Sequence, residues 1–221
     1  MRITAEARKV VRARIVKSAS ELFTRKGFES TTTRDIAASA RIAAGTLFNY
    51  FSSKEALAMS FIAEALWQAN LEFDHRQAQQ PGSVSTLEES LFDYIATGLR
   101  HLRAHRPYVA EVLESTLSLF STAPTCEEAD RVRVAHLEAV RHLIAERAIG
   151  RSSDFAGVGR NEPSSVTMHL YWTLYLGVLA YWSADESAHQ EETLALLDQT
   201  VRLFAASLSA NHSPLEVNRG A

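Results

Sequence analysis

The sequence predicts an all-α protein of about nine helices. Apolar residues recur at helical spacings of three and four along most of the 221 residues, and no segment alternates convincingly as a strand would. Capping residue types and helix breakers divide this pattern into segments. Three short helices are expected first and six longer ones after them.

The N-terminal helices have clear boundary signals. A first helix carries its apolar positions from Val11 to Phe23 and is expected to end at Gly27, a suitable C-cap. Thr32 and Asp35 have the spacing of a capping box before a short helix over 34–40. A third short helix is expected over 44–50.

The later helices follow from the same signals. Ser52 and Glu55 predict a second capping box, which opens a helix running to about Arg76. The breaker Pro81-Gly82 ends this part of the chain. Beyond it, helices are expected over about 87–105, 107–120, 125–149, 163–182 and 191–208, with a loop over 150–162.

Charge is distributed unevenly along the chain. Residues 1–60 contain 11 Lys and Arg against 5 Asp and Glu, whereas the remainder contains 12 against 21. A basic N-terminal region on an acidic body is typical of a nucleic-acid-binding surface confined to one end. The single cysteine, Cys126, excludes an intrachain disulfide, and no apolar run is long enough to cross a bilayer. We therefore expect a cytoplasmic protein without a membrane partner.

The first 51 residues fit a helix-turn-helix. Two short helices separated by a few residues follow a longer one, and the third is too short to be stable without packing on the first. Its outer side would offer Ala44, Thr46, Asn49 and Tyr50. Asn can bind an adenine edge, a Thr methyl can meet a thymine methyl, and Tyr50 and Lys54 can reach phosphate oxygens.

The segment "TTTRDIAASARIAAGTLFNYFSSKEAL", residues 31–57, resembles the DNA-binding signature of the TetR family of transcriptional repressors. The matching positions are Thr32, Ile36, Ala37, Ala40, Gly45, Thr46, Leu47, Tyr50, Phe51, Ser53, Lys54, Glu55 and Leu57. The resemblance implies phosphate contacts from Thr32, Thr33, Arg34 and Lys54, and base contacts from Ala44, Thr46 and Asn49.

Three positions depart from the family pattern. Arg41 replaces the usual turn glycine, Ala43 replaces a capping serine, and Phe48 replaces a tyrosine and so lacks its hydroxyl. A non-glycine residue in a left-handed turn costs roughly 1–2 kcal/mol, and a lost serine cap costs about 1 kcal/mol. We expect Arg41 to offset part of this cost by contacting phosphate.

The last two helices are expected to form a dimer interface. The segment 169–182 is apolar on nearly every side, and the last helix has the alternating spacing of a coiled-coil seam. Two such helices from each chain would make a four-helix interface, as the family resemblance also implies. The expected interface residues are Leu174, Gly177, Val178, Tyr181, Leu194, Leu197, Val201, Phe204 and Leu208.

Aromatic side chains in the C-terminal region are candidates to line an effector site, because they combine apolar area with polar tips. These candidates are Phe92, Tyr108, Leu117, Phe120, Tyr171, Trp172 and Tyr175. They favour a small apolar or aromatic effector, although ordinary core packing also explains them.

Other site types find little support. His101 and His105 have the i, i+4 spacing of metal ligands, but they stand among Arg100, Arg103 and Arg106, which repel a cation. The "GVGR" at Gly157 lacks the rest of a dinucleotide-binding motif, and no G-x-S-x-G nucleophile motif occurs. We expect no enzyme activity, cofactor or metal.

These observations predict a helix-turn-helix DNA-binding domain over 1–53, a connecting helix over 54–80, a ligand-binding and dimerisation domain over 81–211 and a flexible tail over 212–221. The expected function is a dimeric repressor that leaves a palindromic operator when a small molecule binds. Two alternatives stay open: a constitutive regulator or activator without an effector, and a helical protein-interaction module.

Overall fold

The computed structural model describes residues 4–79, 85–117, 127–149 and 163–210, all of whose regular elements are helical. The α-helices are α1 (Ala5–Lys26), α2 (Thr33–Ser39), α3 (Ala44–Leu47), α4 (Lys54–Gln79), α5 (Leu87–Leu102), α6 (Arg106–Leu117), α7 (Glu127–Ile149), α8 (Ser165–Ala184) and α9 (Glu191–Ala210). Short 3-10 turns, Arg103–His105 and Ala188–Gln190, lead into α6 and α9. The all-α prediction is confirmed, and none of the described helices is long and apolar enough to span a bilayer.

The chain divides into two compact units, and each unit is made of two stretches that are separated in the sequence. The first unit contains residues 1–65 and 104–132, and the second contains residues 66–103 and 133–221. Helices α4 and α7 therefore contribute to both units. The domain borders expected at residues 53 and 80 stay a prediction.

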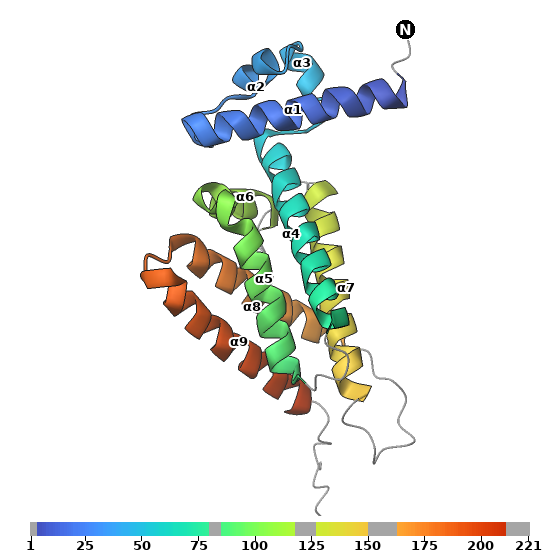
Figure 1. Ribbon diagram of the computed structural model, residues 1–221, viewed down its shortest axis with the longest axis vertical. Coiled ribbons are helices and arrows are strands. Elements are labelled where there is room, and N and C mark those ends of the chain that lie inside the picture. The colour runs from blue at the N-terminus through green and yellow to red at the C-terminus, as the bar shows by residue number, and fades with distance from the viewer. Residues whose placement is uncertain (1–3, 80–84, 118–126, 150–162, 211–221) are drawn as a thin grey trace, which may run out of the picture. The chain divides into compact units, whose positions relative to one another are not determined.

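The first unit is built on the long helix α1. Ile15, Ala19 and Leu22 form its buried stripe, against which α2 packs, and α3 packs on α2 in turn (Figure 1). Gly27 ends α1 with a φ of 83°, the left-handed conformation expected of a glycine C-cap. Its amide donates a hydrogen bond to the carbonyl of Phe23, 3.0 Å away.

The second unit is centred on α8 and α9. Helix α9 packs against both α5 and α8 (Figure 1). The buried side chains include Trp172, Trp182 and Phe204. Helix α8 contains no Asp, Glu, Lys or Arg over 20 residues. Uncharged and mostly apolar residues therefore occupy the other faces of α8 as well as the face that α9 covers.

One expected helix cap differs from the structure, and a second is not among the described residues. Helix α4 begins at Lys54, and the cap comes from Ser53, whose Oγ accepts a hydrogen bond from the amide of Ala56 at 3.0 Å. The predicted cap, Ser52, was one residue too early, because adjacent serines give the same sequence signal. Thr125, the expected cap of the helix over 125–149, lies outside the described residues.

Candidate functional site

Helix α2 begins with the predicted capping box. The Thr32 amide donates to the Asp35 carboxylate at 3.0 Å, and the Asp35 amide donates to the Thr32 hydroxyl at 3.1 Å. Hydrogen bonds from the Thr32 amide and hydroxyl hold the pKa of the Asp35 carboxyl below its usual value, and Lys26 adds to this. The Thr32 side chain is therefore engaged within the helix, while Thr33 is half-buried and Arg34 is exposed.

The turn after α2 is a Schellman motif with arginine in the position that usually holds glycine. The Ile42 amide donates to the Ala37 carbonyl at 3.0 Å, and the Arg41 amide donates to the Ala38 carbonyl at 3.1 Å. Arg41 has a φ of 52°, and its side chain is exposed. The sequence-based expectation of a non-glycine residue in a left-handed turn is confirmed.

Helix α3 is a single turn, shorter than the seven residues expected. Ala43 occupies its N-cap position without a side-chain hydrogen bond, as predicted. Beyond Leu47 the backbone continues in tighter turns, with the Asn49 amide on the Thr46 carbonyl and the Tyr50 amide on the Leu47 carbonyl. The missing cap and the lack of a following helical turn leave the segment dependent on its packing.

That packing separates a buried from an outer side of residues 44–51. Leu47 and Phe51 are buried, whereas Ala44 and Asn49 are exposed and Thr46 and Tyr50 are half-buried. Phe48, one of the departures from the family pattern, is 51% exposed. The structure therefore leaves the predicted base-contacting side chains accessible, and their contacts with DNA stay a prediction.

The ammonium of Lys54, another predicted phosphate contact, already has a partner. Its Nζ donates to the Phe28 carbonyl at 3.0 Å and lies 4.0 Å from the centroid of the Phe28 ring. The side chain is half-buried. One donor of Lys54 thus ties the start of α4 to the segment after α1, a structural role that the sequence did not reveal.

Tyr108, a predicted effector contact, lies in the first unit. Its ring stacks on Phe28 with centroids 5.1 Å apart and also contacts Phe23, while its hydroxyl hydrogen-bonds His105. Burial lowers the pKa of His105 and raises that of Tyr108. In this structure Tyr108 joins α6 to the end of α1.

Three of the predicted effector contacts, Tyr171, Trp172 and Tyr175, surround a histidine that the sequence analysis missed. His136 on α7 is 6% exposed, and its Nε2 lies 2.9 Å from the Tyr171 hydroxyl. Its ring stacks on Tyr175 with centroids 4.1 Å apart, and Trp172 meets it edge-on. The other ring nitrogen, Nδ1, lies 3.4 Å from the hydroxyl of Tyr94.

Burial lowers the pKa of His136 to about 3, so the imidazole is neutral near pH 7 and has one donor and one acceptor nitrogen. Burial also raises the pKa of Tyr171 and Tyr175. The spacing of buried positions on α7, from Val132 through His136 to Val140, contained the signal that could have placed this histidine in the core.

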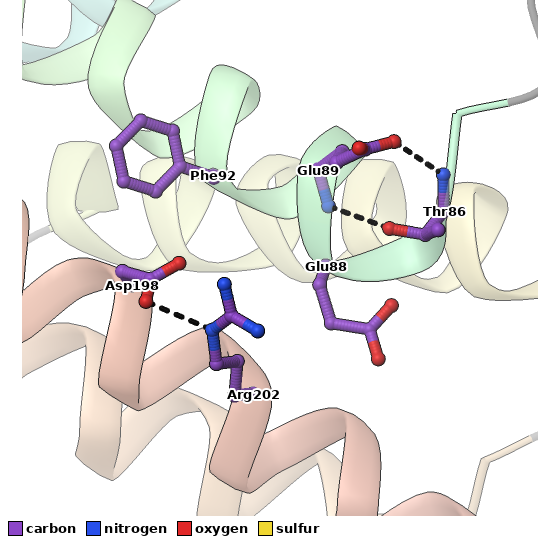
Figure 2. Close-up of a pocket in the computed structure, with 6 residues that line it drawn as sticks. All are labelled: Thr86, Glu88, Glu89, Phe92, Asp198 and Arg202. Carbon is purple, nitrogen blue, oxygen red and sulfur yellow. Dashed lines mark hydrogen bonds and ion pairs between the residues drawn. The ribbon is translucent and has the colours of Figure 1, made fainter.

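Phe92 lies apart from this cluster, in an open groove of about 570 Å³. Figure 2 shows Thr86, Glu88, Glu89 and Phe92 at the start of α5, facing Asp198 and Arg202 on α9. Arg202 lies between Asp198, which accepts its Nε hydrogen bond at 2.8 Å, and Glu88. Of the remaining candidates, the Leu117 side chain and all of Phe120 lie outside the described residues.

The predicted dimer residues divide into two groups. Val178, Leu197, Val201 and Phe204 are at most 2% exposed in the single chain, so they belong to its own core. Gly177, Tyr181 and Leu194 are exposed, and Leu174 and Leu208 are half-buried. The coiled-coil spacing on α9 is thus used within the chain, where it faces α5 and α8.

The outward face of α8 is nevertheless apolar. Val166 is 77% exposed and Leu170 is 41% exposed, and both lie on the same side as Thr173 and Gly177 at spacings of three and four. Leu203 on α9 is also exposed. The sequence analysis did not include Val166, Leu170 or Leu203, because it assigned the interface to the regular seam instead.

His101 and His105, the rejected metal pair, have separate partners. His101 lies 2.7 Å from the Glu72 carboxylate, whereas His105 bonds Tyr108. Across the described ranges, no group of three or more His, Cys, Asp or Glu side chains has the proximity needed to hold a metal ion.

Comparison with known proteins identifies the chain. Residues 15–60 match the profile "Bacterial regulatory proteins, tetR family", and residues 90–217 match "Tetracyclin repressor-like, C-terminal domain". The chain belongs to the TetR family. It is therefore a transcriptional regulator with a helix-turn-helix DNA-binding region and a C-terminal ligand-binding region.

Individual relatives are distant. The HTH-type transcriptional regulator UidR of Escherichia coli K12 is 26% identical over 183 residues, which cover 81% of this chain and 85% of UidR. Thermus thermophilus FadR, a TetR-family repressor solved with lauroyl-CoA, has a TM-score of 0.66 at 19% identity. The superposed region covers 92% of this chain and 97% of the FadR chain. Bacillus subtilis FadR, solved with stearoyl-CoA, has a TM-score of 0.54 at 16% identity, covering 87% and 96%. At these identities the two structures share the fold.

Proposed function

We propose that this TetR-family regulator is a repressor that binds a palindromic operator as a homodimer. The observation that carries the proposal is the outer side of residues 44–51, where Ala44, Thr46 and Asn49 remain accessible above the buried Leu47 and Phe51. An asparagine amide can bond two atoms of an adenine, and small residues beside it permit close approach to base edges. The exposed Arg34 and Arg41 would contact phosphates and set the register.

Assembly as a dimer is supported by the outward face of α8. A helix with no charged residue and with Val166 77% exposed leaves apolar area that a second copy can cover. Small residues such as Gly177 permit close helix approach, and among the described residues no side chain would lie within 4 Å of a Cβ at this position. A two-fold dimer would place its two helix-turn-helix regions on half-sites that are about 34 Å apart, or a multiple of this distance.

The effector would be a small apolar or aromatic molecule, bound among the rings that surround His136. Tyr171, Trp172 and Tyr175 supply apolar area, and the imidazole with its tyrosine partners supplies a polar point for orientation. The FadR neighbours bind acyl-CoA esters, whose chains are also apolar. A coupling of about 1–3 kcal/mol between the two sites would change operator affinity 5- to 150-fold.

Selection of bound duplexes from random-sequence DNA tests the operator. We expect a palindromic consensus and a dimer on each duplex. Asn49→Ala should relax the preference at one position of each half-site, whereas Arg34→Ala should weaken all sequences alike. Lys54→Ala is a poor comparison, because it would also remove the contact with Phe28. Equal affinity for every sequence would contradict the proposal and favour a protein-interaction module.

The effector is tested by release of the selected duplex. Lauroyl-CoA, stearoyl-CoA and a panel of aromatic acids and phenols would be titrated against the complex. A releasing compound should lose its effect in His136→Phe, which keeps the ring but removes both nitrogens. Failure of every compound would favour the constitutive alternative and leave the operator result standing.

A further inference from the structure

The first turns of α1 precede the segment that matches the family profile. Helix α1 starts at Ala5, ten residues before the match begins at residue 15. Four basic residues, Arg8, Lys9, Arg12 and Arg14, and one acidic residue, Glu6, occupy these turns. A cluster of positive charge beside a DNA-binding region strengthens binding to DNA phosphates.

Two of these arginines continue the buried face of the helix. Arg8, Arg12, Ile15 and Ala19 follow one another at spacings of four, three and four, so they share one side of α1. Ile15 and Ala19 are fully buried, whereas Arg8 and Arg12 are exposed. The face that forms the core farther along α1 thus carries two cations at its start.

Both cations contact the end of residues 44–51, the segment that carries the proposed base contacts. The Arg12 guanidinium carbon lies 4.8 Å from the ring centroid of Phe51, which is 2% exposed. The Arg8 guanidinium carbon lies 5.8 Å from the ring centroid of Tyr50, and its Nη2 donates to the Asn49 carbonyl at 3.5 Å. Arg12 therefore stacks on a buried ring of the first unit, and Arg8 lies beside Asn49 and Tyr50.

The charge of Arg8 is not neutralised by this arrangement. Arg8 contacts a carbonyl and a ring, and within the described residues no ion pair joins it to a carboxylate, whereas the adjacent Lys9 lies 4.0 Å from Glu6. A guanidinium has five N–H donors, so one bond to Asn49 leaves others free for an anion. Phosphate oxygens match its geometry.

We propose that Arg8 is an additional phosphate-binding residue, held at the edge of the DNA-binding surface by Tyr50 and the Asn49 carbonyl. The inference rests on the proposed binding of operator DNA and deepens it. Arg8 would contact the backbone that flanks each half-site and would add affinity without adding sequence preference. The carbonyl bond would also link this contact to the backbone that presents the Asn49 side chain.

The test is the salt dependence of binding to a duplex selected by the wild-type chain. Each neutralised phosphate contributes about 0.9 to the slope of log K against log salt. Loss of Arg8 from both heads of a dimer should therefore lower the slope by about 1.8. Arg8→Gln removes the charge, Arg8→Lys keeps it, and Lys17→Gln removes a charge from the exposed side of the same helix as the matched control.

We expect the lower slope in Arg8→Gln, a near wild-type slope in Arg8→Lys and Lys17→Gln, and an unchanged consensus in all three. Arg8→Met, which keeps an apolar stem against Tyr50, must reproduce the fall if Arg8→Gln fails to fold. A wild-type slope in both neutral variants, or an equal fall in Lys17→Gln, would overturn the inference. A wild-type chain without sequence preference would instead reject the proposed operator binding.

Discussion

In the described part of the chain, two connections between helices contain left-handed non-glycine residues, and these two corners are supported very differently. Between α2 and α3, Arg41 has a φ of 52°, and the next helix starts at Ala43 without a side-chain cap. Between α8 and α9, His189 and Gln190 have φ values of 53° and 61°. Each such residue costs roughly 1–2 kcal/mol, which the surroundings must offset.

The second corner has that support. Asp185 accepts hydrogen bonds from the amides of Ser187, at 2.8 Å, and Thr193, at 2.9 Å, and also from the Thr193 hydroxyl. Trp182 donates to the Gln190 side chain at 3.1 Å. The first corner relies on backbone bonds and on packing of Leu47 and Phe51. The difference would suit a fixed α8–α9 pair in the proposed dimer and a DNA-binding segment that becomes fully ordered on the proposed operator.

The largest expected effect is at Asp185. Asp185→Ala removes the acceptor of both donors of Thr193, which is 1% exposed. An unsatisfied buried donor costs about 1–3 kcal/mol, so the free energy of unfolding should fall by this amount or more. Chemical denaturation measures it, and Asp198→Ala, which removes a half-exposed carboxylate that binds Arg202 on α9, is the control. A similar small loss in both variants would mean that the second corner is not specially supported.

Strong acid should weaken the second corner. Hydrogen bonds from Ser187 and Thr193 hold the pKa of Asp185 well below its usual value, which is about 3.9 in an unfolded chain. The stability from this carboxylate is therefore complete above about pH 4 and is lost as pH falls through the lower folded pKa. Unfolding midpoints of the wild type and Asp185→Asn between pH 6 and 2 check this. Parallel curves for the two proteins would contradict it.

A smaller effect, of opposite sign, is expected at the first corner. Arg41→Gly removes left-handed strain and should stabilise the fold by about 1 kcal/mol. It should also lower operator affinity, because the phosphate contact proposed for the side chain is lost. Denaturation and duplex titration together measure the two changes. Higher stability with unchanged affinity would show that Arg41 has no role on DNA.

The smallest effect is expected at Ala43. Ala43→Ser supplies the missing cap of α3 and should add about 1 kcal/mol or slightly less, because α3 is only four residues long. Thr32→Ala, which removes an existing cap from α2, should cost a similar amount and serves as the reciprocal control. If Ala43→Ser left the stability unchanged while Thr32→Ala lowered it, α3 would be held by packing alone.

Features set by local chemistry were predictable from the sequence. The Thr32–Asp35 capping box, the Gly27 C-cap and the left-handed Arg41 all follow from two to four neighbouring residues, and the structure has each of them. The predicted cap of α4 was one position too early, because Ser52 and Ser53 both offer a hydroxyl. Local patterns thus fix the class of a feature more firmly than its register.

Features set by tertiary packing were not predictable. The spacing of Leu197, Val201 and Phe204 on α9 suits a seam between chains, yet these residues are buried within their own chain, where α9 packs on α5 and α8. His136 was missed because a single histidine on a helix gives no sign of the four aromatic side chains that other helices bring to it. Periodicity shows which side of a helix is covered, but not what covers it.

The placement of Tyr108 in the N-terminal unit has a consequence for the exchange of parts between regulators. Residues 104–132 belong to that unit although nearly 40 positions separate them from its other stretch, residues 1–65. A chimera that transplanted only the first stretch would give the Phe28 ring a foreign neighbour in place of Tyr108. A graft that preserves the unit must therefore carry the start of α6 with the DNA-binding helices, or match its aromatic contact in the recipient.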